Sequence, residues 1–293
     1  MGQATEAVSQ LREVECTLRA DERFPVPVSD GYSVYSALLG VLDEVDASVS
    51  TSVHDSPMGS LHSSGLVGAF GSSDRPHHKT VLSGEEYELS LGIVHPDDTD
   101  VFQALVSALV LEGGIIELSH GELRVERFES ENATHEDLVA KAGEYDDPTI
   151  EMEFQTPTCI EEAGNVTTAF PHRLPMFNSL AGKWNNSCPA ELEIELYREM
   201  VLESVIEKPH VPGYKSGYEY ETHSVLVNRV DGEDGENRNI IRQGFTGICE
   251  YDFKNASESV ENAITSLAMF APYSGVGSAV ARGCGSVNIE VIE

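Results

Sequence analysis

Hydrophobic positions along the first half of the chain change their period several times, and each change predicts a new element. Val14, Cys16 and Leu18 alternate with polar residues, as in a strand that buries one face. The apolar residues between 32 and 45 then recur every three or four positions, which predicts a helix whose free amides Ser29 or Asp30 is suited to cap. In order, the pattern predicts a strand over 14–20, a helix over 32–45, a strand over 87–93, a helix over 101–109 and strands over 115–118 and 123–128.

The second half contains a similar set of elements. It predicts a strand over 150–154, a helix that opens near Pro175, strands over 222–230 and 244–253, a helix from Asn255 to Phe270 with Glu258 at capping-box spacing, and a strand over 287–291. The segment 189–209 fits a helix or a strand, and its assignment stays open.

We interpret each half as β-α-β-β-α-β, the split βαβ arrangement of the ferredoxin-like fold, although the pattern of the first half does not itself show a strand between residues 45 and 87. The predicted class is α+β, with two tandem ferredoxin-like (RRM-like) domains over residues 1–145 and 146–293 and a glycine-rich loop near the C-terminus. The acidic segment 129–148 has few large apolar residues, and we interpret it as the linker between the domains.

Composition agrees with two folded domains and adds an unusual charge. The chain has 293 residues, 40% of them hydrophobic, and its 50 acidic and 18 basic residues give a net charge of -32. The acidic residues are spread among well-patterned segments, so they do not indicate a disordered tail. In molar salt the Debye length is about 3 Å, and surface carboxylates then mainly keep a protein hydrated. We interpret the charge as adaptation to a salt-rich cytoplasm, as in a halophilic archaeon, in preference to binding of a polycation.

Membrane, disulfide and zinc signals are weak throughout the sequence. No apolar run approaches the roughly 20 residues of a membrane helix, and the first residues lack the pattern of a signal peptide, so we expect a cytoplasmic protein without membrane contact. The five cysteines are far apart and include no C-x-x-C pair, so neither a disulfide framework nor a metal site is predicted.

A cluster of glycines precedes the last predicted strand, in FAPYSGVGSAVARGCGSVNIEV (270–291). Gly275, Gly277, Gly283 and Gly285 fall in two G-x-G pairs, and glycine is costly in ordered structure unless its freedom is used. They either shape a tight connection or allow the backbone to approach a ligand closely. The stretch is not a P-loop, because no G-x-x-x-x-G-K-[ST] occurs.

Four segments together resemble the CRISPR-associated endoribonucleases that cut precursor CRISPR RNA within its repeats. They are QTPTCI (155–160), FPHRLPMFNSLAGKWN (170–185), GFTGICEYDF (244–253) and GVGSAVARGCG (275–285). The glycine-rich loop is the signature of the wider repeat-associated RNA-binding superfamily. The resemblance implies cleavage without metal or cofactor that leaves a 2',3'-cyclic phosphate and a 5'-hydroxyl. It also implies repeat RNA as partner, and other subunits of a CRISPR interference complex as possible partners.

The resemblance also implies which residues carry the reaction. The family's catalytic histidine follows the first helix, which makes His54 in STSVHDSPMGSLHSSGL (50–66) the candidate general base and His62 its alternative. Many relatives carry a lysine a few residues after this histidine, and some carry a tyrosine late in the first helix. Both are missing here, and Lys79 is a candidate source of positive charge. The candidate RNA-binding residues are Gly275, Gly277, Arg282, Gly283 and Gly285, with Lys79.

Two other functions stay open on the sequence. A catalytically silent RNA-binding subunit of a CRISPR effector complex would share the fold, and the missing lysine and tyrosine favour it. A small-molecule enzyme whose glycine loop binds a nucleotide is the third alternative, because ferredoxin-like folds host many functions.

Overall fold

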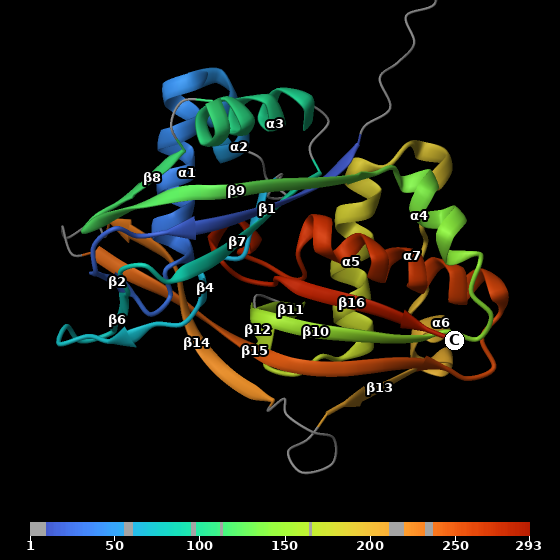
Figure 1. The fold of residues 1–293 in the computed structure, drawn as a ribbon. Helices are drawn as coiled ribbons and strands as arrows, with labels where there is room; N and C mark the ends of the chain where they lie inside the picture. The colour runs from blue at the N-terminus through green and yellow to red at the C-terminus, as the bar shows by residue number, and fades with distance from the viewer. Residues whose placement is uncertain are drawn as a thin grey trace, which may run out of the picture.

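A computed structural model of the protein describes residues 10–55, 61–94, 98–111, 114–163, 166–210, 220–231 and 237–293. The chain forms two large sheets and two small ones, and each large sheet has helices packed against one of its faces (Figure 1). The first sheet draws its strands from residues 11–133 and the second from residues 149–292. This separation supports our proposal of two tandem domains.

The first half contains the predicted strands and helices together with short additional pieces. In the sheet the strands lie in the order β3-β7-β1-β9-β8, and a smaller sheet has the order β2-β6-β5. Alternate residues of β1 and β7 enter a core that α1 and α3 cover (Figure 1). The elements are β1 (Leu11–Arg19), β2 (Phe24–Pro27), α1 (Gly31–Val45), α2 (Ala47–Asp55), β3 (Leu61–Ser63), β4 (Val67–Gly68), β5 (Gly71–Ser72), β6 (His78–Val81), β7 (Glu86–Ile93), α3 (Asp98–Val106), the π-helical turn η1 (Ser107–Leu111), β8 (Ile115–Leu118) and β9 (Gly121–Ala133).

The second half has the strand order β13-β15-β10-β16, with β14 paired to β15. The four main strands in chain order are β1, β3, β7 and β9 in the first half and β10, β13, β15 and β16 in the second. In both sheets they lie side by side in the order second, third, first, fourth, so the fold is two tandem ferredoxin-like domains. The elements are α4 (His135–Ala142), β10 (Thr149–Thr158), β11 (Ile160–Ala163), β12 (Val166–Thr168), α5 (Arg173–Ser187), the 3-10 turn η2 (Ala190–Leu192), α6 (Arg198–Ser204), β13 (Val205–Pro209), β14 (Glu221–Asp231), β15 (Asn237–Phe253), α7 (Glu258–Ser274), the 3-10 turn η3 (Val280–Arg282) and β16 (Val287–Ile292).

The acidic segment 129–148 is more ordered than a linker. Its first residues complete β9, and α4 follows with a capping box in which Thr134 and Asp137 bond each other's backbone amides. Leu138 of α4 is buried in the core of the second half, against α7. The interpretation as a linker was wrong because one buried leucine and a good cap hold this short helix in place.

Two other local expectations differ from the structure, and one segment that was left open can be assigned. The segment 189–209 contains both a helix and a strand, α6 and β13. Helix α7 begins at Glu258 after Ser257, while Asn255 takes a left-handed φ of 53°. Asp30 sits at the N-cap of α1 but makes no side-chain cap, because its buried carboxylate accepts from the Leu66 amide and pairs with Lys79.

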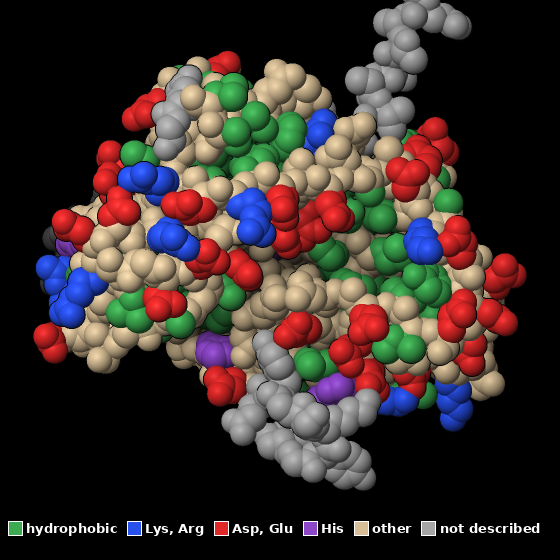
Figure 2. Space-filling view, in the orientation of Figure 1, with side chains coloured by type: hydrophobic (Ala, Val, Ile, Leu, Met, Phe, Trp, Pro, Cys, Tyr) green, Lys and Arg blue, Asp and Glu red, His purple; other side chains and the backbone are tan. Residues whose placement is uncertain are grey.

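Acidic side chains are spread widely over the face of the molecule seen in Figure 2. Figure 2 shows Asp and Glu spread over most of the visible face, between fewer Lys and Arg side chains. Among the described residues, no helix combines the length and the apolar character that a membrane span requires.

The two halves meet where their backbones come unusually close together. A Cβ built on Gly31, at the start of α1, would lie 2.2 Å from the Arg282 carbonyl oxygen and 2.4 Å from the Gly283 Cα. A Cβ on Gly92 of β7 would lie 2.0 Å from the Tyr273 carbonyl oxygen, at the end of α7. Only glycine fits at these positions, since real Cβ atoms do not approach backbone so closely. The helix α1, the strand β7 and the glycine-rich loop are thereby held in fixed relation.

We expect Gly31→Ala to lower the free energy of unfolding by about 1–3 kcal/mol, the usual cost of forcing an extra methyl group into a packed contact. Gly40→Ala is the matched control, because Gly40 lies in the same helix and a Cβ there would meet no atom within 4 Å. The control should gain about 0.5–1 kcal/mol from helix propensity. Denaturant unfolding checks both, and equal effects of the two substitutions would contradict the close contact.

A cluster of carboxylates lies near this junction. Glu13 of β1 is directly opposite Glu131 of β9 and Gly92 of β7. Burial, and then the charges of Glu15 and Glu131, raise the pKa of Glu13 from 4.5 to about 7. The folded protein therefore holds a proton on Glu13 over a pH range in which the unfolded chain releases it.

Because the folded state binds more protons between pH 4.5 and 7, Glu13 lowers the free energy of unfolding as the pH rises through this range. Glu13→Gln should remove this loss and stabilise the protein at pH 8 by on the order of 1–3 kcal/mol, with little effect at pH 4.5. Glu88→Gln, an exposed carboxylate on β7, is the control and should change stability by less than about 0.5 kcal/mol. A Glu13→Gln protein with the pH dependence of the parent would refute the raised pKa.

Candidate active site

An open cavity of about 980 Å³ lies where the two halves meet. The first half contributes α1, α2 and β3, while the second contributes β11, α5, α6, β13 and the glycine-rich loop. Its lining includes Tyr35, Val53, His54, Leu61, Glu161, Glu162, His172, Arg173, Asn178, Ser179, Lys183, Arg198, Leu202, Glu207 and all residues from Gly277 to Arg282. A cavity of this size admits a segment of a chain ligand.

The charge of the cavity differs from that of the chain as a whole. Four basic residues, Arg173, Lys183, Arg198 and Arg282, line it beside three acidic ones, whereas the whole chain has 18 basic and 50 acidic residues. Two histidines, His54 and His172, lie in the same lining. The protein has therefore concentrated basic groups where an anionic ligand can enter.

His54 reaches the cavity from the last turn of α2. The sequence favoured a loop here, but the segment is helical. At the start of the helix the Asp46 carboxylate accepts a hydrogen bond from the Ser48 amide at 2.8 Å. Val49 and Val53 then anchor one side of α2 in the core. The His54 side chain is 66% exposed, and its Nδ1 lies 2.9 Å from the Asp55 carboxylate. With Nδ1 next to Asp55, Nε2 is the ring nitrogen that a general base would use.

His62, the alternative base, lies inside the protein. It is 2% exposed on β3, and a Cβ on Gly275 would come within 2.7 Å of its ring. Burial, and then the charge of Lys183, lower its pKa to about 3, so the ring is neutral at physiological pH. A ring enclosed in this way cannot contact a phosphodiester, and its role is in packing beneath the glycine-rich loop.

The glycine-rich loop begins where α7 ends, and its shape depends on left-handed backbone. Gly275 has a φ of 63° and Gly283 a φ of 82°, values that other residues adopt at a cost. Gly277 and Gly285, also at positive φ, press against the backbone of Cys159 and Val276. The glycines are thus needed for the folded connection itself.

Many amides of this loop are already bonded within the protein. The Val276 amide donates to Gly285, the Gly277 amide to the Ser179 hydroxyl, and the Gly285 amide to Pro157. These three amides are therefore engaged within the protein, and contact of the loop with RNA stays a prediction. The part that lines the cavity is the turn from Gly277 to Arg282, and Arg282 ties this turn to β14 by donating to the Val227 carbonyl at 2.8 Å.

Lys183 of α5 holds the end of α7 from below. Its ammonium donates to the Ser274 carbonyl at 3.0 Å and to the Gly275 carbonyl at 2.7 Å. Burial lowers the pKa of Lys183 to about 7, while the two carbonyls and the helix C-terminus favour its charged form. An amine that is protonated below about pH 7 is thus placed at the base of the cavity, under the loop.

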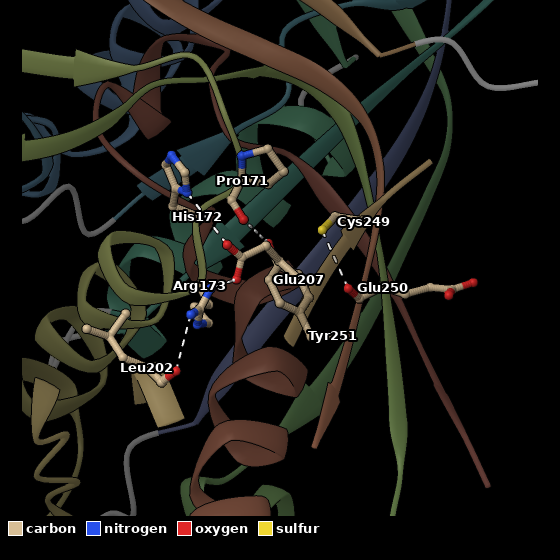
Figure 3. Close-up of polar contacts among 8 residues, drawn as sticks. All are labelled: Pro171, His172, Arg173, Leu202, Glu207, Cys249, Glu250 and Tyr251. Atoms are coloured by element: carbon tan, nitrogen blue, oxygen red, sulfur yellow. Dashed lines mark hydrogen bonds and ion pairs between the residues drawn. The ribbon is translucent and has the colours of Figure 1, made fainter. Parts of the chain in front are cut away.

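Residues at the start of α5 also belong to the site, and their role was missed in the sequence. Arg173 pairs with Glu207 and donates to the Leu202 carbonyl, and His172 Nδ1 lies 3.7 Å from the Glu207 carboxylate (Figure 3). The Tyr251 hydroxyl fixes this segment by donating to the Pro171 carbonyl at 2.9 Å. The signal was present in FPHRLP, which puts an imidazole and a guanidinium directly before a helix.

Lys79 is placed elsewhere. Its ammonium lies 3.0 Å from the Asp30 carboxylate and 3.6 Å from the centre of the Phe70 ring, and it does not line the cavity. The basic residues that line the cavity are instead Arg173, Lys183, Arg198 and Arg282. Tyr35, expected to pack in the core, is 7% exposed there and also borders the cavity.

Comparisons with known proteins agree on one family. The sequence profile of CRISPR-associated endoribonuclease Cas6 matches residues 152–287. A direct comparison with curated proteins found no match.

Solved structures match nearly the whole chain. A Thermus thermophilus Cas6 in a product complex is similar with a TM-score of 0.68 and 18% identity, over 96% of this chain and 100% of that one. Another Cas6 product complex has a TM-score of 0.63 and 20% identity, over 96% and 99%. A Cas6-related protein from Pyrococcus furiosus has a TM-score of 0.58 and 12% identity, over 96% and 98%. These likenesses show the tandem fold, and the sequence match relates residues 152–287, most of the second half, to the CRISPR-associated endoribonuclease Cas6 family.

Proposed function

We propose that the protein cleaves precursor CRISPR RNA within its repeats, without a metal ion, by attack of a ribose 2'-hydroxyl on the adjacent phosphate. The observation that carries this proposal is that His54, from the first half, and the turn Gly277–Arg282, from the second, line one cavity. Solved relatives described as product and substrate-mimic complexes support repeat RNA as the ligand. The protein acts in the cytoplasm, and it delivers its product to other subunits of a CRISPR interference complex.

The chemistry needs one base, one acid and an aligned phosphate. His54 Nε2 takes the proton of the 2'-hydroxyl as the bond from the 2'-oxygen to phosphorus forms and the bond to the 5'-oxygen breaks. The leaving 5'-oxygen takes a proton from a second donor, for which His172 is the other imidazole of the cavity. The products are a 2',3'-cyclic phosphate and a 5'-hydroxyl.

The turn and the nearby cations hold the phosphate. Arg282 is part of the glycine-rich loop, Lys183 of α5 lies beneath that loop, and Arg173 lies at the start of α5. In strong salt, release of counterions contributes less to RNA affinity, so directional hydrogen bonds from such groups must supply more of it. The family's missing lysine after His54 is replaced by these residues from the second half.

A cleavage assay tests the proposal. The protein is incubated in concentrated potassium chloride with a chelator and with RNA that contains the repeat of its own genome. We expect discrete cleavage and a cyclic-phosphate end. His54→Ala should slow cleavage by roughly 100-fold or more, the usual contribution of a general base, while RNA affinity changes little.

His120→Ala is the control, because His120 is exposed between β8 and β9 and does not line the cavity. It should cleave like the parent. An unchanged rate in His54→Ala would remove His54 as the base. Tight binding of repeat RNA without any cleavage by the parent would instead favour the catalytically silent subunit, which the missing lysine and tyrosine also favour.

A further inference from the structure

Three carboxylates stand in one row on the outer face of the second sheet. Glu250 of β15 is directly opposite Glu151 of β10, which is directly opposite Glu290 of β16. Residues opposite each other on neighbouring strands point to the same face, and like charges at such positions destabilise a sheet. This face is turned away from the helices, because the alternate residues Ile150 and Met152 enter the core.

An imidazole completes the group. The backbone amide of His210 donates to the Ile248 carbonyl at 2.8 Å, which extends the pairing of β13 with β15 by one residue. This places the ring next to Glu250, with Nε2 3.0 Å from a carboxylate oxygen. Each of Glu151, His210 and Glu250 offers one ligand atom, and these three atoms lie within 4.8 Å of one another. Lys208, opposite Glu250 on β13, pairs instead with Asp252.

We propose that Glu151, His210 and Glu250 bind one divalent transition-metal ion of the Zn²⁺ class. The ion replaces the repulsion between the two facing carboxylates with attraction to a shared cation. A set of one imidazole nitrogen and two carboxylate oxygens leaves a fourth position for water. The imidazole favours Zn²⁺ over Mg²⁺ and Ca²⁺, which prefer oxygen ligands alone.

The role of this ion is structural, and it is separate from the cavity. Figure 3 shows the Glu250 side chain directed away from Tyr251 and Glu207, which face the helices and the cavity. None of the three ligands lines the cavity. The ion joins β10, β15 and the end of the edge strand β13, so it stabilises the second sheet without entering the cleavage reaction.

Binding is tested by calorimetric titration of the whole protein, stripped of metal, with zinc chloride at fixed salt. We expect one equivalent to bind and the melting temperature to rise. Glu151→Gln and His210→Gln should each weaken binding by at least about tenfold and remove the rise in melting temperature. Glu153→Gln is the matched control, because Glu153 lies on the same face of β10 and bonds Asn288 outside the group. It should bind zinc like the parent.

Cobalt separates this site from the five cysteines. Co²⁺ bound by nitrogen and oxygen gives weak visible bands without the strong thiolate charge-transfer band, and these bands should disappear in His210→Gln. The proposal is overturned if the parent does not bind zinc, if the ligand variants bind it as tightly as the parent, or if thiolate bands appear. RNA cleavage in the presence of a chelator should be unaffected, so failure here leaves the proposed function standing.

Discussion

The structure depends on one close backbone contact between its halves. The start of α1 can approach the glycine-rich loop only because Gly31 and Gly283 both lack a Cβ. The contact brings α1 and the following helix α2, which carries His54, to the same side as the turn Gly277–Arg282. Neither half alone contains the cavity, so the site forms only when the two halves pack together.

Charge then distinguishes the cavity from the rest of the surface. A protein with a net charge of -32 repels RNA over most of its area, yet four of its 18 basic residues line this cavity. Three of them are restrained: Arg173 by Glu207, Lys183 by two backbone carbonyls, and Arg282 by Val227. Restrained donors lose little freedom on binding, which suits recognition by hydrogen bonds where long-range attraction is screened.

The sequence was sufficient for the longer strands and helices because they follow local periods, but it did not identify α2, β3 and α4. The alternation through Val14 and Leu18 and the helical spacing around Leu38 and Leu42 identify β1 and α1 correctly. It was insufficient where the decisive contact is distant. The resemblance ranks His54 above His62, but only the fold shows that His62 is buried under Gly275. The contribution of Arg173 and the group of Glu151, His210 and Glu250 depend on pairings across tens of residues, which no local pattern reveals.

The central claim is that His54 and the turn of the glycine-rich loop contact the same RNA segment. It is tested most directly by NMR titration with repeat RNA that carries a 2'-deoxy substitution at the cleavage site. We predict that the His54 imidazole resonances and the amide resonances of residues 279–283 shift together, with one affinity. Shifts of the loop that leave the His54 ring unchanged, or shifts confined to the outer face of the second sheet, would contradict the account.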